Sequence, residues 1–219
     1  MQLLAAAEFH PAVTPPPLGP DEIHLWFFPH WEKQREASNA PGVRALLAAY
    51  LTVAPETLRF ERGEHGKPRL AGLQFNLSHT GNALLLGVSQ HIELGVDLES
   101  ATRPVRSVAE LARRWFAPGE AQALAALPET AQAPAFLRLW TCKEAVLKAS
   151  GAGISSGLER VEFELSSVGL VRGMRGGEPW RVLALAPDDA HIGAIAFRGK
   201  SVPVRAFVTQ AIAAEAQSS

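Results

Sequence analysis

Hydrophobic and polar positions follow two periods along the first half of the chain, and these predict a mixture of strands and a helix. The apolar run Ile23–Phe28 predicts a strand, and Leu73–Ser89 predicts two more around a polar turn. Ile92–Ser100 alternates in part and predicts a further strand. Apolar positions at helical spacing predict a helix over Val43–Val53.

The second half follows a similar order of elements. Two short helical patterns, Val105–Phe116 and Pro118–Leu127, precede the longest one, Pro134–Ser150, whose proline suits a first helical turn. Four short strands are then expected: Val161–Leu165, Trp180–Ala186, His191–Phe197 and Pro203–Val208. The repeated order predicts an α+β fold of two related halves, residues 1–103 and 104–219, joined near Ser100–Val108.

Composition and charge narrow the class of protein. The chain has 219 residues, 47% hydrophobic and 20% charged, so a packed core is expected. The net charge of −1 argues against nonspecific nucleic-acid binding. The one cysteine, Cys142, rules out a disulfide within the chain and suits a reducing, cytoplasmic setting. No signal peptide or membrane span is expected, and the proline-rich lead-in His10–Glu22 should be extended or mobile.

Two acids stand together on the strand predicted near residue 95. Asp97 and Glu99 are two residues apart, so their carboxylates point to the same side. Like charges side by side repel each other unless a cation lies between them, and Mg²⁺ prefers such oxygen ligands. A solvated strand end is the commoner explanation for this pattern alone.

The long helical pattern places an aromatic, an acid and a base on one face. Trp140, Glu144 and Lys148 recur every four residues. Glu144 is a candidate oxygen ligand or base, and Lys143 and Lys148 are candidate phosphate contacts. The alternatives are a Glu–Lys surface pair and a packed tryptophan.

Polar residues in "FNLSHT" (75–80) are expected at a turn between apolar strands. Ser78 and His79 are candidate donors to phosphate oxygens, although Asn and Ser also favour turns for local reasons. Lys67 lies in a second expected turn, Gly63–Pro68. No Gly-rich phosphate loop, nucleophile elbow or zinc spacing is present.

The motifs together have a recognisable order. "HGKP", "FNLSHT", "GVDLE" and "WTCKEAVLK" follow one another over roughly Val43–Ile154, and this arrangement resembles the Sfp-type 4′-phosphopantetheinyl transferases. The resemblance implies a fold of two similar α/β halves forming a pseudo-dimer. It implies Mg²⁺-dependent transfer of the phosphopantetheine arm of coenzyme A to a serine of an apo acyl or peptidyl carrier protein, with release of 3′,5′-ADP.

The resemblance also implies roles for individual residues. Asp97, Glu99 and Glu144 correspond to Mg²⁺ ligands, and Glu144 also to the base for the incoming hydroxyl. The remaining positions correspond to contacts with coenzyme A: Lys148 near the pyrophosphate with Lys143 beside it, Ser78, His79 and Arg44 at the 3′-phosphate, and Lys67 at the nucleotide.

The resemblance further implies a monomer, and it leaves open whether the carrier protein serves fatty-acid, polyketide or nonribosomal peptide biosynthesis. The sequence departs from the family pattern before Arg44. Family members usually carry a denser basic stretch there, whereas this sequence has only Lys33 and Arg35. Two other functions use the same residues. One is a Mg²⁺-dependent pyrophosphate hydrolase acting on coenzyme A-like nucleotides, and the other is a binding module without activity, which the full set of acids disfavours.

Overall fold

A computed structural model describes residues 1–32, 34–63, 66–151, 157–174 and 180–209. The elements of the first half are β1 (Leu3–Ala5), β2 (Phe9–Ala12), β3 (Ile23–Phe28), α1 (Pro41–Leu51), β4 (Glu61–Arg62), β5 (Pro68–Arg69), β6 (Gln74–Thr80), β7 (Ala83–Ser89) and β8 (Leu94–Ser100). Those of the second half are α2 (Val108–Trp115), α3 (Pro118–Ala125), α4 (Glu129–Ser150), β9 (Phe163–Leu165), β10 (Val171–Met174), β11 (Trp180–Asp188), β12 (His191–Arg198) and β13 (Val204–Thr209). The α+β class is confirmed.

The larger strands form two sheets. The first sheet has the order β1-β11-β12-β8, and the second has the order β2-β13-β3-β7-β6. Strand β8 comes from the first half of the chain but pairs with β12, while β13 from the second half lies between β2 and β3. Each sheet therefore contains strands from both halves.

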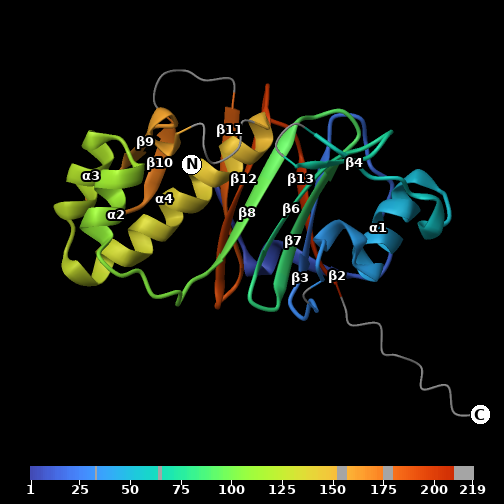
Figure 1. Cartoon of the computed structure of the whole chain (residues 1–219), viewed down its shortest axis with the longest axis horizontal. Coiled ribbons are helices and arrows are strands. Elements are labelled where there is room, and N and C mark those ends of the chain that lie inside the picture. The colour runs from blue at the N-terminus through green and yellow to red at the C-terminus, as the bar shows by residue number, and fades with distance from the viewer. Residues whose placement is uncertain (33, 64–65, 152–156, 175–179, 210–219) are drawn as a thin grey trace, which may run out of the picture.

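Three apolar clusters hold four layers together, which run across Figure 1 from α2–α4 through the two sheets to α1. The first cluster lies between helices α2–α4 and the first sheet, the second between the two sheets, and the third between the second sheet and α1. On β8, Val96 and Leu98 enter the cluster between the sheets. Alternation then turns Asp97 and Glu99 toward α4.

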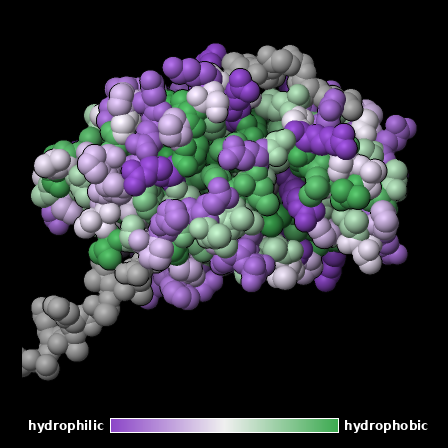
Figure 2. Space-filling view, turned by 180° about the vertical axis from the view of Figure 1, so that it is seen from behind, coloured by the Kyte–Doolittle hydropathy of each residue, from purple (hydrophilic) through white to green (hydrophobic). Residues whose placement is uncertain are grey.

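The surface carries hydrophilic and hydrophobic residues side by side, as the view from behind in Figure 2 shows. Among the described residues, no helix has the length and apolar character that crossing a membrane requires.

Most predicted elements are confirmed, with two corrections. The long helix begins at Glu129, not Pro134, so the proline lies inside it. Residues 129–132 are compatible with a helix and place an acid in its first turn, where the helix dipole favours it. The polar run 75–80 is part of strand β6, and the turn follows at Gly81–Asn82.

The polar residues of β6 lie in a strand because β8 supplies their partners. Asn76 Oδ1 accepts a hydrogen bond of 2.8 Å from the backbone N–H of Val96. Ser78 Oγ accepts one of 3.2 Å from the N–H of Leu98. Strands β6 and β8 are terminal in their sheets, so these side chains join one sheet to the other. We call this junction the seam.

Helix α4 approaches β8 closely because residue 95 is glycine. A Cβ at Gly95 would lie 2.3 Å from Ala145 O and 2.3 Å from Ala149 N. These atoms belong to the helix backbone and cannot rotate away as a side chain can. The glycine therefore sets the distance between the helix and the strand that carry the candidate acids.

Gly95→Ala is expected to lower the free energy of unfolding by about 1–3 kcal/mol or more, because the new methyl group pushes α4 from β8. Urea denaturation measures this. Gly173→Ala is the matched control, since a Cβ there meets nothing within 4 Å. Equal stability of the two variants would contradict the close approach.

Candidate active site

Three carboxylates converge where α4 crosses β8. Asp97 and Glu99 point to the same side of the strand, as predicted, and Glu144 faces them from the helix. Asp97 and Glu144 are buried, at 5% and 3% exposure. Burial raises the pKa of both Glu99 and Glu144, and the charge of Asp97 raises both further, so the three groups are electrostatic neighbours.

Lys148 offsets part of this negative charge. Its Nζ lies 2.6 Å from Asp97 Oδ1 and donates to Ser78 Oγ at 3.0 Å. Ser78 Oγ in turn donates to the same Asp97 oxygen at 2.9 Å. Side chains of α4, β8 and β6 thus meet in one closed triangle of hydrogen bonds.

Two carboxylate oxygens in this cluster are left without a partner. Asp97 Oδ2 and Glu144 Oε1 are buried and accept no hydrogen bond from any residue that the structure describes. Buried carboxylate oxygens without donors are costly unless a cation or a ligand satisfies them. Their chemistry fits a hard divalent cation such as Mg²⁺.

Glu99 is held apart from these oxygens. Its carboxylate forms an ion pair with Arg103, four residues further along the chain. For this reason, the acids are neighbours without forming a preformed cage. In the part of the chain that the structure describes, no group of three or more His, Cys, Asp or Glu side chains is arranged to hold a metal ion.

Glu144 has the properties of a base that works near neutral pH. Burial, followed by the charge of Asp97, raises its pKa to about 7, and Lys148 offsets only part of the shift. A group with a pKa close to the working pH exchanges protons most effectively. The side chain is placed for this by α4, which presents Glu144 one turn before Lys148.

Trp140 lies on the same helix face as Glu144 and Lys148, but its role there is packing. Its ring stacks on Phe136 at 5.9 Å between centroids and tilts against Phe116 at 6.3 Å. It belongs to the cluster under α2–α4 and is half-buried there. The packing alternative is therefore correct for this residue, whereas Glu144 and Lys148 face the site.

The prediction that Lys143 contacts a phosphate is wrong. Its side chain is fully buried, and Nζ lies 2.7 Å from Glu120 Oε2. The ammonium also donates to the carbonyls of Leu158 and Val161. Lys143 and Glu144 are adjacent on the helix, so they point about 100° apart. One enters the helical layer and the other faces the sheet.

Glu120 is the partner that sequence analysis missed. Its carboxylate also accepts from the backbone N–H groups of Ala117 at 2.9 Å and Phe163 at 2.8 Å. The pair therefore ties α3, α4 and β9 together. Burial lowers the pKa of Lys143, and the charge of Glu120 opposes this. An acid in the first turn of an apolar helix looked like an ordinary N-terminal acid, so no local signal marked it.

Lys67 and Arg44 are largely engaged with backbone carbonyls. Lys67 Nζ donates to Leu94 O at 3.0 Å and Lys148 O at 2.8 Å, and burial lowers its pKa to about 8. Arg44 donates to the carbonyls of Pro55 and Leu58. Lys67 therefore ties its turn to β8 and α4, and Arg44 ties α1 to the segment before β4. Their proposed ligand contacts stay predictions.

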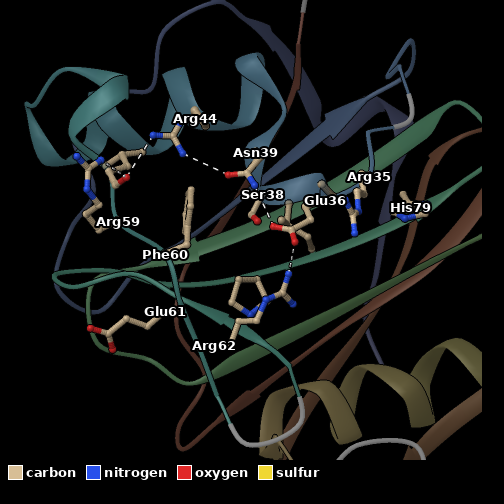
Figure 3. Close-up of a pocket in the computed structure, with 14 residues that line it drawn as sticks. Arg35, Glu36, Ser38, Asn39, Arg44, Arg59, Phe60, Glu61, Arg62 and His79 are labelled. Atoms are coloured by element: carbon tan, nitrogen blue, oxygen red, sulfur yellow. Dashed lines mark hydrogen bonds and ion pairs between the residues drawn. The ribbon is translucent and has the colours of Figure 1, made fainter.

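A cationic pocket lies on the other face of β6. It has a volume of about 460 Å³ and lies between α1, β4 and β6. Figure 3 shows Arg44 and Arg59 toward one end and Arg35 and His79 toward the other. Its charged lining residues are Arg35, Glu36, Arg44, Arg59, Glu61, Arg62 and His79.

Only some of the residues that line this pocket were predicted from the sequence. His79 and Arg44 were expected near a phosphate, and both line it. Arg59 and Arg62 were missed, because the segment that carries them, which leads into and forms the two-residue strand β4, has no motif of its own. Ser78 is separated from His79, since consecutive strand residues point to opposite faces. Of the described residues that line the pocket, β6 contributes Leu77 and His79 but not Ser78.

Comparisons with known proteins agree with the motif order. A family model described as the 4′-phosphopantetheinyl transferase superfamily matches residues 93–196, which include β8 and α4. The 4′-phosphopantetheinyl transferase HetI of Nostoc sp. is 37% identical over 192 residues, covering 83% of this chain and 79% of the relative.

Two further relatives match over shorter stretches. A putative 4′-phosphopantetheinyl transferase of Synechocystis sp. is 42% identical over 135 residues, which is 59% of this chain and 54% of the relative. The 4′-phosphopantetheinyl transferase AcpT of Salmonella typhimurium is 40% identical over 120 residues, which is 53% of this chain and 60% of the relative. The chain therefore spans little more than half the length of these two.

Lys143→Met is expected to lower the free energy of unfolding by about 3–5 kcal/mol, because it leaves the buried Glu120 carboxylate without its cation. Chemical denaturation measures the loss. Arg198→Met is the control, since its ion pair with Glu93 is exposed and is expected to contribute only about 0–1 kcal/mol. Comparable losses in both variants would show that Lys143 is not a buried partner.

Glu144 should make the metal-free protein less stable as pH rises. Its folded pKa of about 7 lies above its ordinary value of 4.5, so the folded state holds the proton more tightly. The cost of ionisation is absent below about pH 4.5, grows between the two values, and is complete above about pH 7.

Glu144→Gln is therefore expected to gain stability over wild type as pH rises through this window, by roughly 3 kcal/mol at most. Denaturation curves from pH 4 to 8 test this. Glu164→Gln is the control, because it makes the same substitution at an exposed strand position. If the difference in the free energy of unfolding between Glu144→Gln and wild type stays constant from pH 4 to 8, Glu144 is not a buried acid with a raised pKa.

Proposed function

The chain belongs to the 4′-phosphopantetheinyl transferases, and we propose from this premise that it moves the phosphopantetheine arm of coenzyme A to a serine of an apo acyl or peptidyl carrier protein. The other product is 3′,5′-ADP. The observation that supports this most is the meeting of Asp97, Glu144 and Lys148, with a cationic pocket on the other face of β6. The attacking hydroxyl belongs to the partner, so the chain needs a base and charge stabilisation but no nucleophile.

Glu144 is the proposed base. In the metal-free protein its pKa is about 7, which suits a group that accepts the proton of the carrier serine at neutral pH. A positioned carboxylate of this kind contributes about 10²–10⁴-fold in rate. Lys148 is the proposed electrostatic contact for the diphosphate, since its side chain is 28% exposed and can present an N–H to an incoming oxygen.

Asp97, Glu99 and Glu144 are the proposed Mg²⁺ ligands. The two orphaned oxygens, Asp97 Oδ2 and Glu144 Oε1, support this assignment. Glu99 joins them only if its carboxylate leaves Arg103. Bound Mg²⁺ would supply positive charge to the diphosphate at which the transfer takes place.

The cationic pocket is the proposed site for the nucleotide end of coenzyme A. His79 and Arg44 are the proposed contacts of the 3′-phosphate, and Arg35, Arg59 and Arg62 add positive charge around them. Arginine forks suit phosphate oxygens because they donate two parallel hydrogen bonds. Lys67 has one N–H beyond its two carbonyl contacts, which leaves room for the nucleotide contact proposed for it.

The proposed architecture is that of the Sfp-type group. Residues 1–103 and 104–219 would be two related halves that form a pseudo-dimer within one chain. The exchange of β8 and β13 between the sheets supports this, since it interlocks the two halves. A monomer is the corresponding proposal for the assembly.

Incubation with coenzyme A, Mg²⁺ and an apo carrier protein tests the function. We expect the carrier to gain the mass of one phosphopantetheine arm, as measured by intact-protein mass spectrometry. Release of 3′,5′-ADP without a carrier would instead support the pyrophosphate hydrolase.

Asp97→Asn is expected to lower the transfer rate by on the order of 10²-fold or more, as for other losses of one preorganised charged group. The reason is that it removes the negative charge that Lys148 and the cation both need. Asp189→Asn, at an exposed position of the turn before β12, is the control. Wild-type turnover of Asp97→Asn would exclude Asp97 from the machinery.

A further inference from the structure

Ser78 differs from the other residues expected at the 3′-phosphate, because its hydroxyl has no capacity left. It donates its one proton to Asp97 Oδ1 at 2.9 Å. It accepts from Lys148 Nζ at 3.0 Å and from the N–H of Leu98 at 3.2 Å. A serine hydroxyl has one donor and two acceptor positions, and all three are used.

The hydroxyl is also on the wrong side of β6 to reach the cationic pocket. Ser78 is 7% exposed and faces β8, while its neighbour His79 is exposed and lines the pocket. A phosphate in the pocket would therefore meet His79. To bind Ser78 as well, it would need the hydroxyl proton that Ser78 donates to Asp97.

The partners of Ser78 are the two groups on which the transfer chemistry depends. The hydroxyl orients Asp97 by binding Oδ1, which leaves Oδ2 as the oxygen without a donor. The same atom gives Lys148 a second fixed acceptor beside Asp97. The bond from Leu98 anchors the hydroxyl to the backbone of β8, so all three groups keep one geometry.

We propose that Ser78 is a positioning residue, which sets the orientation of Asp97 and the place of Lys148, and that it does not contact the nucleotide phosphate. This rests on the proposed function, because it assigns a role within that site. Partners that orient a metal-binding carboxylate typically contribute about 10–100-fold to metal affinity or activity.

Asn76 provides a matched control two residues earlier on the same strand. Its Oδ1 accepts from the N–H of Val96 at 2.8 Å, so it makes the same kind of seam contact as Ser78. Among the described residues, its side chain bonds to the backbone of β8 and not to Asp97 or Lys148. Asn76→Ala therefore weakens the seam without removing a partner of the acid.

The experiment compares Ser78→Ala, Ser78→Thr and Asn76→Ala with wild type. Three quantities are measured: kcat and KM for coenzyme A with an apo carrier, the ratio of kcat/KM for coenzyme A to that for its 3′-dephospho analogue, and the affinity for Mn²⁺ by paramagnetic resonance. Urea denaturation of each variant records the loss of stability at the seam.

We expect Ser78→Ala to lower kcat and the Mn²⁺ affinity by about 10–100-fold each, with an unchanged KM for coenzyme A and an unchanged preference over the dephospho analogue. Ser78→Thr keeps the hydroxyl and should restore both. Asn76→Ala should lose stability but keep kcat and Mn²⁺ affinity. His79→Ala, the comparison for a phosphate contact, should lose the preference.

Two results would overturn the proposal. One is a raised KM for coenzyme A in Ser78→Ala with loss of the preference, as in His79→Ala, which would make Ser78 a phosphate contact. The other is equal losses in Ser78→Ala and Asn76→Ala, which would make its role purely structural. If Ser78→Ala does not fold, Ser78→Cys replaces it, because the thiol has similar size and is a weaker hydrogen-bonding group.

Failure of the proposed function can be told apart from failure of this inference. A wild-type protein that modifies no carrier would remove the transferase proposal. The Mn²⁺ measurement needs no turnover, so it still decides whether Ser78 orients Asp97.

Discussion

The contact between the Lys148 ammonium and the Asp97 carboxylate is the interaction on which the site depends. It joins α4 to β8, and through Ser78 it reaches β6 in the other sheet. Each of these elements is held by its own apolar cluster. Without a cation at this point, the helix would carry Glu144 toward two other acids with little to offset their repulsion.

Several groups of the site lower the stability of the folded protein. Burial raises the pKa of Glu144 to about 7, and two carboxylate oxygens lack a donor. Such groups are rarely kept in a protein interior unless a ligand or a reaction uses them. The apolar packing of α4 against β8 and β12 holds them in place, and Gly95 permits the approach.

Two lysines five residues apart on α4 illustrate how burial divides structural from chemical roles. Lys143 is fully buried and paired with Glu120, where it connects α3, α4 and β9. Lys148 is 28% exposed and paired with Asp97. Removing the partner of a fully buried charge lowers the free energy of unfolding strongly. A partly exposed ammonium, in contrast, can exchange one hydrogen-bond acceptor for another. The adjacent pair Lys143–Glu144 thus contains one residue for the core and one for the site.

The sequence alone determined which side chains lie on the same side of one strand or one helix. Strand alternation places Asp97 and Glu99 on one side, and helical spacing places Glu144 and Lys148 on one face. The order of four motifs was enough to indicate the enzyme family. Only the tertiary structure decided what lies opposite each face. It paired Lys143 with Glu120, turned Ser78 toward Asp97, and gave the polar residues of β6 partners on β8. The physical reason is that periodicity describes a side chain relative to its own element, while burial and ion pairing depend on segments far away in the chain.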